Sequence, residues 1–135
     1  MSTHIGNPDS PFAPDDPLSG RIIGAAIAVH KSLGPGLLES VYHECMRIEL
    51  EELGIPFKSE VPIPIVYRGR TLAARHKLDL IVDERVIVEI KAIDLLAKIH
   101  DAQLLTYLRL TSKRLGLLIN FSVPFLRDGL KRIVL

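Results

Sequence analysis

The stretch LDLIVDERVIVEIKA, residues 78–92, decides the fold that this sequence predicts. It contains two short apolar segments rich in Val, Ile and Leu, which is typical of two strands joined by the turn Asp83-Glu84-Arg85. Three charged side chains nevertheless lie within these strands: Asp79, Glu89 and Lys91. Because a folded core excludes uncompensated charges, these side chains need partners, and a divalent cation compensates the two carboxylates best.

The alternation of side chains along a strand decides which of these residues share a face of the sheet. In the first strand, alternation separates two sets: Lys77, Asp79 and Ile81 from Leu78, Leu80 and Val82. In the second strand, it separates two further sets: Ile87, Glu89 and Lys91 from Val86, Val88 and Ile90. A three-residue turn pairs Val82 with Val86 and so joins the two apolar sets on one face. The same register pairs Asp79 with Glu89.

Two carboxylates that face each other across a strand pair repel, and partial burial adds a desolvation cost. The register is therefore unfavourable unless a cation intervenes or one carboxylate keeps its proton. Lys91 supplies one positive charge, and a Mg²⁺ or Mn²⁺ ion with oxygen ligands would supply two more. The alternative is an exposed face on which Asp79 forms a salt bridge with Lys77 or Lys91.

The composition of the 135 residues, with 47% hydrophobic and 24% charged residues, predicts a globular protein. The longest run of apolar residues and glycine, Ile22–Val29, is far shorter than the roughly 20 residues of a membrane span. No secretory signal opens the chain, so we expect a soluble protein that is not exported. The single cysteine, Cys45, excludes an internal disulfide and fits a reducing cytoplasm.

The order of the expected elements is that of one domain with helices and strands mixed. Residues 1–18 are rich in Pro and Asp and predict a disordered tail, followed by a single domain over residues 19–135. A first helix, capped by Asp16 or Ser19, is expected to end at Gly34. Two further helices are expected at about residues 37–53 and 95–111. Besides the pair in residues 78–91, strands are expected at about residues 61–67, 71–74, 115–123 and 130–135.

Each of the last two helices shows an apolar stripe at helical spacing. In the second helix the expected buried stripe is Leu38, Val41, Cys45 and Ile48. In the third helix it is Leu96, Ile99, Tyr107 and Leu110. Gln103 falls on this last stripe, and a buried amide at that position needs hydrogen-bond partners.

A basic cluster precedes the charged strands, although the net charge of the chain is only +1. The cluster contains Arg68, Arg70, Arg75 and Lys77, together with His76. It could contact the phosphates of a nucleic acid. The alternative, which these residues alone leave open, is a solvated hairpin.

The order of a glutamate-bearing helix, Asp79 and then Glu89-Ile90-Lys91 after a hairpin resembles the PD-(D/E)XK phosphodiesterase superfamily. The segment GPGLLESVY is similar to the signature of its GxxExxY proteins, with Gly36, Glu39 and Tyr42 at the named positions. The resemblance extends over most of the chain from about residue 22. It implies an α/β (α+β), restriction-endonuclease-like core with a central mixed β-sheet flanked by helices. One departure is Leu78, which stands where the superfamily has the proline that names it.

The resemblance also implies roles for individual residues. It implies metal ligands at Asp79 and Glu89, with the backbone carbonyl of Ile90 as a further oxygen ligand. It implies catalytic roles for three residues: Lys91, Glu39 and Gln103. Tyr42 and His30 are expected to support the site. Four of these residues also have a structural alternative: a helix-dipole contact for Glu39, a surface position for Gln103, core filling for Tyr42 and helix capping for His30.

The function implied by the resemblance is a nuclease dependent on Mg²⁺ or Mn²⁺ that hydrolyses the phosphodiester bonds of DNA, or less favourably of RNA. A homodimer is expected by the same resemblance, whereas the cytoplasmic location and the lack of a membrane partner are expected from the single cysteine and the short apolar runs. The alternative is a catalytically silent protein of this fold that binds nucleic acid or another protein.

Overall fold

The computed structural model describes residues 16–73 and 75–135. In these residues the chain forms, in order, α1 (Pro17–Leu33), α2 (Glu39–Glu52), β1 (Phe57–Ile63), β2 (Val66–Tyr67), β3 (Arg70–Thr71), β4 (His76–Val82), β5 (Val86–Lys91), α3 (Lys98–Thr111), β6 (Leu115–Asn120), the 3₁₀-helix η1 (Leu126–Gly129) and β7 (Leu130–Val134).

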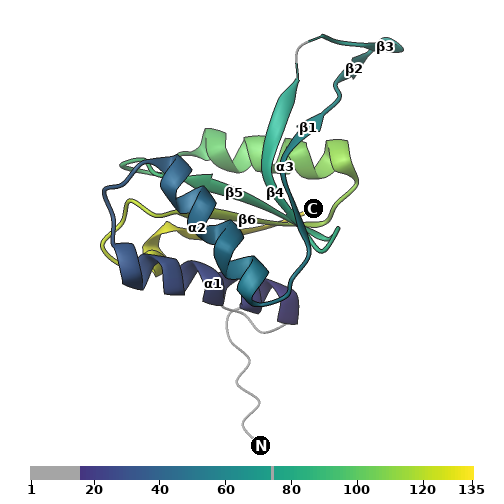
Figure 1. Cartoon of the computed structure of the whole chain (residues 1–135). Coiled ribbons are helices and arrows are strands. Elements are labelled where there is room, and N and C mark those ends of the chain that lie inside the picture. The colour runs from purple at the N-terminus through teal and green to yellow at the C-terminus, as the bar shows by residue number, and fades with distance from the viewer. Residues whose placement is uncertain (1–15, 74) are drawn as a thin grey trace, which may run out of the picture.

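The central sheet is mixed and has the strand order β1-β4-β5-β6-β7. β5 and β6 are parallel, and α3 provides the crossover between them, whereas the other neighbouring strands are antiparallel. α1 and α2 cover one face of this sheet and α3 covers the other (Figure 1). The predicted fold class, a mixed sheet flanked by helices, is confirmed.

The two short strands β2 and β3 form a separate hairpin. It extends β1 and β4 beyond the body of the protein as a projecting arm (Figure 1). Arg68 and Gly69 make the turn, and both have positive φ angles, of 50° and 75°, as a tight two-residue hairpin requires. The basic cluster of the sequence therefore lies on and beside this arm.

Of the two residues expected to cap the first helix, Asp16 is its N-cap. The Asp16 side chain accepts a hydrogen bond from the Leu18 amide at 2.9 Å, whereas the Ser19 hydroxyl donates back to the Asp16 carbonyl. The helix ends at Gly34, whose φ of 69° suits glycine. Of the tail expected over residues 1–18, residues 1–15 lie outside the described part, and Pro17 already belongs to α1.

The core consists of two clusters, one on each face of the sheet. On the α1–α2 face the sheet contributes Leu80, Val82, Val86, Val88, Ile90, Leu117 and Ile119. On the α3 face it contributes Ile63, Leu78, Ile81, Ile87 and Leu118. Both strands of the pair in residues 78–91 are thus largely buried on both faces, with Asp79 and Lys91 half-buried and Glu89 buried.

The β1–β4 hairpin changes face at one position, where Glu60 lies opposite Asp79 in the register. Leu80 packs in the cluster on the α1–α2 face, but Leu78 packs in the cluster on the α3 face. Glu60 has a φ of 52°, a left-handed backbone conformation that interrupts the regular alternation of the hairpin. The expectation that Leu78 shares a face with Leu80 and Val82 is therefore wrong.

The buried stripes of α2 and α3 differ from the predicted ones. α2 buries Tyr42, Met46 and Leu50, and α3 buries Leu104, Tyr107 and Leu108. Several residues of the predicted stripes are exposed instead, among them Leu38, Ile48, Ile99 and Leu110. No helix in the described part of the chain has the length and hydropathy needed to cross a membrane.

Candidate active site

The candidate site lies where β4 and β5 separate. Their backbone pairing includes Val82 with Val86, as predicted, but it ends at Leu80 with Val88. The predicted backbone pairing of Asp79 with Glu89 is therefore not formed, because the sheet opens at this point into a fork.

Two carboxylates replace the missing ladder bonds at the fork. The Ile90 amide donates a hydrogen bond to Asp79 Oδ2 at 2.7 Å. The Asp79 amide donates to Glu89 Oε1 at 3.2 Å. Each carboxylate is thus fixed by a main-chain donor of the opposite strand, so the two predicted metal ligands lie together, as the register argument required.

The carbonyl of Ile90 faces the same fork. The amide and the carbonyl of one residue in a regular strand point to the same side, and the Ile90 amide points toward Asp79. Lys91, the next residue, points its carbonyl the other way and accepts from the Phe121 amide at 2.9 Å. The Ile90 carbonyl oxygen is therefore a third oxygen atom near the two carboxylates.

Glu89 is the most perturbed acid of the site. Its side chain is buried, with 5% of the residue exposed. Burial and then the negative charge of Asp79 raise the pKa of Glu89 to about 8, while the Asp79 hydrogen bond and Lys91 oppose the rise. Glu89 and Asp79 therefore form a close pair of carboxyl groups that oppose each other's ionisation, with Lys91 beside them on β5.

Glu39 approaches the pair from the first turn of α2. Partial burial and then Asp79 raise the pKa of Glu39, whereas Lys91 and His43 lower it. His43 lies one turn further along α2 and its Nε2 atom is 3.0 Å from the Ser59 hydroxyl. Glu39 is the first residue of α2, after the cap residue Leu38, so its carboxylate also lies at the positive end of the helix dipole.

Gln103 and Tyr107 approach from α3 on the other side. Tyr107 is buried, and burial, then Glu89 and Asp79, raise its pKa, whereas a hydrogen bond with the Gln103 side chain lowers it. The Tyr107 hydroxyl also lies 3.3 Å from His76 Nδ1. Gln103, Tyr107 and His76 line a groove of about 420 Å³ between α3 and the base of the arm.

Tyr42 and His30 do not contact the carboxylates. The Tyr42 hydroxyl donates to the Gly34 carbonyl at 2.6 Å and accepts from the Leu37 amide at 3.1 Å. Its ring stacks on Phe121 with a centroid distance of 4.6 Å. Tyr42 thus fixes the α1–α2 connection that carries Glu39, and does not hydrogen-bond Glu39 itself. His30 Nε2 lies 2.8 Å from the Val123 carbonyl, in a separate cavity.

Two residues beside the candidate site were not singled out in the sequence. Tyr107 was assigned to an apolar stripe, although its spacing of four residues from Gln103 could have indicated a shared polar contact. Asn120 is buried, and its Oδ1 atom accepts from the Ile93 and Ser122 amides at 3.1 and 3.2 Å, while its amide nitrogen donates to the Ile93 carbonyl at 2.9 Å. Because Asn120 pairs with Lys91 across β5 and β6, it fixes the end of the strand that carries Lys91.

The four basic residues of the cluster are all exposed. Arg68 and Arg70 lie at the tip of the arm, while Arg75 and Lys77 lie at its base around the start of β4. Lys77 is only two residues from Asp79. The basic cluster therefore leads from the tip of the arm to the fork.

The residues at the fork fit a hard divalent cation in charge and in donor type. Within residues 16–73 and 75–135, no three His, Cys, Asp or Glu side chains are gathered as a complete metal cluster. Asp79, Glu89 and the Ile90 carbonyl nevertheless provide oxygen atoms only, which Mg²⁺ and Mn²⁺ prefer with water in the remaining positions. Burial and Asp79 raise the pKa of Glu89, so a cation beside the pair would favour its ionised form.

Comparison with known families supports this geometry. The model of the PD-(D/E)XK nuclease superfamily matches residues 16–133, which includes every element described above up to β7. Comparison with curated proteins and with solved structures gave no match. Because the family model covers most of the chain, and the carboxylate pair and Lys91 lie together at the fork, this protein belongs to the PD-(D/E)XK nuclease superfamily.

Proposed function

We propose that this protein is a metal-dependent nuclease of the GxxExxY type that hydrolyses phosphodiester bonds, in DNA more readily than in RNA. The observation that carries the proposal is the pair of Asp79 and Glu89 at the fork, with Lys91 on the same strand as Glu89. Membership of the superfamily supports phosphodiester hydrolysis as the reaction. The proposal includes a homodimer and a cytoplasmic location, both expected from the sequence.

In this proposal, Asp79, Glu89 and the Ile90 carbonyl hold Mg²⁺ or Mn²⁺. When bound, such an ion polarises a phosphoryl oxygen and lowers the pKa of a coordinated water molecule. The Lys91 ammonium stabilises the negative charge that develops on the phosphoryl group, a task for a compact cation. Glu39 holds a water molecule on the α2 side of the pair, and Gln103 orients the substrate from α3.

The remaining residues have positioning roles. Tyr42 holds the connection before Glu39, and Tyr107 hydrogen-bonds Gln103 within electrostatic reach of the two carboxylates. Asn120 fixes the end of β5 beyond Lys91. These residues do not exchange protons with the substrate in this proposal.

The competing function is a protein that binds nucleic acid or another protein without cleaving anything. The carboxylate pair disfavours this alternative, because a protein that only binds a polyanion gains nothing from buried acidic side chains. Desolvation of Glu89 also costs stability, which a purely structural role does not explain.

The proposal is tested by incubating the purified chain with single-stranded DNA, duplex DNA and RNA of one sequence. We expect cleavage of DNA with Mg²⁺ or Mn²⁺, and none with EDTA. Cleavage that persists unchanged in EDTA, or preference for RNA over both forms of DNA, would contradict the metal-dependent deoxyribonuclease proposed.

The arm supplies a second test, because its cations are proposed to contact phosphates. The double variant Arg70→Ala/Arg75→Ala is expected to weaken binding to DNA at low salt and to reduce the slope of log K against log[salt] by about 1 to 2, since each phosphate contact contributes roughly 0.9. Arg68 is left unchanged because it has a left-handed backbone conformation in the turn. Binding is measured in EDTA by fluorescence anisotropy across a series of salt concentrations.

The matched control is Lys58→Ala/Lys113→Ala. Both cations interact with Glu84. Glu84 lies in the turn between β4 and β5, at the end of β4 that is away from the arm. The control removes the same charge but should leave the salt slope nearly unchanged. If both double variants reduce the slope equally, the arm has no special role and the binding is only a response to net charge.

A further inference from the structure

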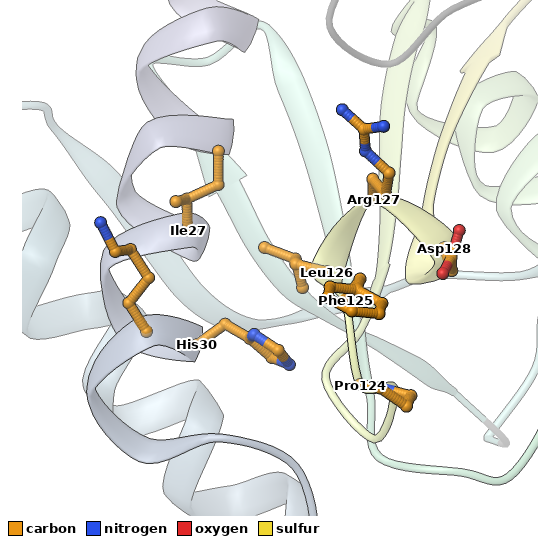
Figure 2. A pocket seen from close by; sticks show the side chains of 8 residues that line it. Ile27, His30, Pro124, Phe125, Leu126, Arg127 and Asp128 are labelled. Atoms are coloured by element: carbon orange, nitrogen blue, oxygen red, sulfur yellow. The ribbon is translucent and has the colours of Figure 1, made fainter.

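A cavity of about 640 Å³ lies outside the fork, between the C-terminal half of α1 and the turn that leads into η1 (Figure 2). α1 contributes Ile27, His30 and Lys31, and the turn contributes residues 124–128. None of these residues has a part in the reaction proposed above. The volume falls within the range of roughly 300 to 1,000 Å³ that is usual for small-ligand sites.

The walls of this cavity are held in place by contacts of their own. The hydrogen bond from His30 to the Val123 carbonyl ties α1 to the turn. Because a carbonyl only accepts, this bond places the proton on His30 Nε2. At the other end of the turn, a Cβ atom at Gly129 would overlap the Asn120 carbonyl oxygen, so only glycine permits this close packing. The cavity is therefore preformed.

The chemistry of the lining combines an aromatic ring with positive charge. The Phe125 residue is 70% exposed and lines the cavity from the turn, whereas His30 lines it from α1 (Figure 2). Lys31 and Arg127 carry positive charges at the cavity, against the single negative charge of Asp128. An exposed aromatic ring next to cations is the combination by which proteins bind the bases and phosphates of single strands.

The cavity lies near the C-terminal ends of β5 and β6, and Lys91 is the last residue of β5. β5 and β6 are parallel, and Lys91 pairs with Asn120 at their ends. The Asn120 side chain then bonds both Ile93, just after β5, and Ser122, which begins the turn of the cavity. The turn of the cavity is thus tied through Asn120 to the end of β5, close enough for one nucleic-acid strand to reach both.

We propose that this cavity binds one nucleotide of the substrate strand beside the bond that is cut, with its base stacked on Phe125 and its phosphate near Arg127 and Lys31. The inference rests on the proposed nuclease function, which it deepens by naming the form of the substrate. Paired bases in a duplex are stacked on their neighbours and cannot lie on a protein ring. The substrate is therefore a single strand, or a duplex end that frays into one.

The test uses tryptophan fluorescence, because the chain contains no tryptophan. In Phe125→Trp, titration with a single-stranded hexanucleotide in EDTA is expected to quench the new indole by base stacking. Phe125→Ala is expected to bind the same fluorescently labelled oligonucleotide about 5- to 100-fold more weakly, which corresponds to the loss of one stacked base. The control is Leu53→Trp, at the far end of α2 from Glu39, where the oligonucleotide should cause no quenching.

The outcomes separate this inference from the nuclease proposal, because EDTA prevents metal-dependent cleavage. Quenching in Phe125→Trp together with weaker binding in Phe125→Ala supports the subsite, even if the protein cuts nothing with added metal. Unchanged binding by Phe125→Ala in a protein that does cut DNA overturns the subsite and leaves the nuclease proposal intact. A mononucleotide that quenches as strongly as the hexanucleotide at equal concentration also overturns it, because the cavity would then take free nucleotides and not a strand.

Discussion

Replacing Lys91 with alanine is expected to slow metal-dependent cleavage of DNA by about 10²- to 10³-fold, the usual effect of removing one preorganised group that stabilises developing charge. Lys91 is the only cation that lowers the pKa of both Glu39 and Glu89 among the described residues, so its ammonium lies within electrostatic reach of both acids. The measurement is the single-turnover rate with saturating Mg²⁺ or Mn²⁺, with unfolding by urea as a check on the fold.

The control variants separate charge from geometry. Lys91→Arg keeps the charge but replaces a compact ammonium by a planar guanidinium, so it is expected to recover little of the rate. Lys98→Ala removes an exposed cation from the start of α3 and should leave the rate within about twofold, as surface changes usually do. A Lys91→Ala protein that keeps more than a tenth of the activity would contradict the role given to this residue.

The position of the site could be predicted because two constraints in the sequence agree. The apolar residues of β4 and β5 specify the register of Val82 with Val86, and that register brings Asp79 near Glu89. What the alternation rule could not supply is the opening of the sheet at the fork. The fork coincides with a change of face at Leu78, beside a left-handed backbone at Glu60 on the neighbouring strand, and no local pattern around Asp79 encodes either feature.

The supporting residues were harder to predict because their partners are main-chain atoms far along the chain. Tyr42 is buried in place of Leu38 because its hydroxyl finds two backbone partners and its ring stacks on Phe121, which removes the cost of burying a polar group. In the sequence, Asn120 looks like an ordinary polar residue at the end of an apolar strand. Its function is apparent only from the three hydrogen bonds that it makes to Ile93 and Ser122.

Replacing Glu89 with glutamine is expected to abolish cleavage and, in the absence of metal, to make the protein more stable at pH 8. The folded Glu89 has a pKa of about 8, whereas the unfolded chain has the ordinary value near 4.5. Between these two values the folded state binds the additional proton, so the free energy of unfolding of the wild type falls as the pH rises through this window. The loss amounts to roughly 3 to 5 kcal/mol at pH 8, because each pKa unit corresponds to 1.36 kcal/mol.

Urea unfolding in EDTA at pH 5, 6.5 and 8 measures this effect. Glu89→Gln has no carboxylate to ionise and should therefore show a much flatter dependence of stability on pH than the wild type. Glu44→Gln, which changes an exposed acid on α2, serves as the matched control and should follow the wild type. If the wild type instead becomes more stable from pH 5 to pH 8, in parallel with Glu89→Gln, then burial does not raise the pKa of Glu89 in the folded protein.

The same residue links the pH dependence to the metal. A cation at the fork needs the ionised carboxylate, so binding must release the proton that Glu89 keeps up to about pH 8. Millimolar Mn²⁺ is therefore expected to stabilise the wild type more at pH 8 than at pH 5, and to restore much of the stability that EDTA-treated protein loses as the pH rises. Glu89→Gln should gain little from Mn²⁺ at either pH. If Mn²⁺ stabilises both proteins equally at pH 8, the ion binds elsewhere and the carboxylate pair is not its site.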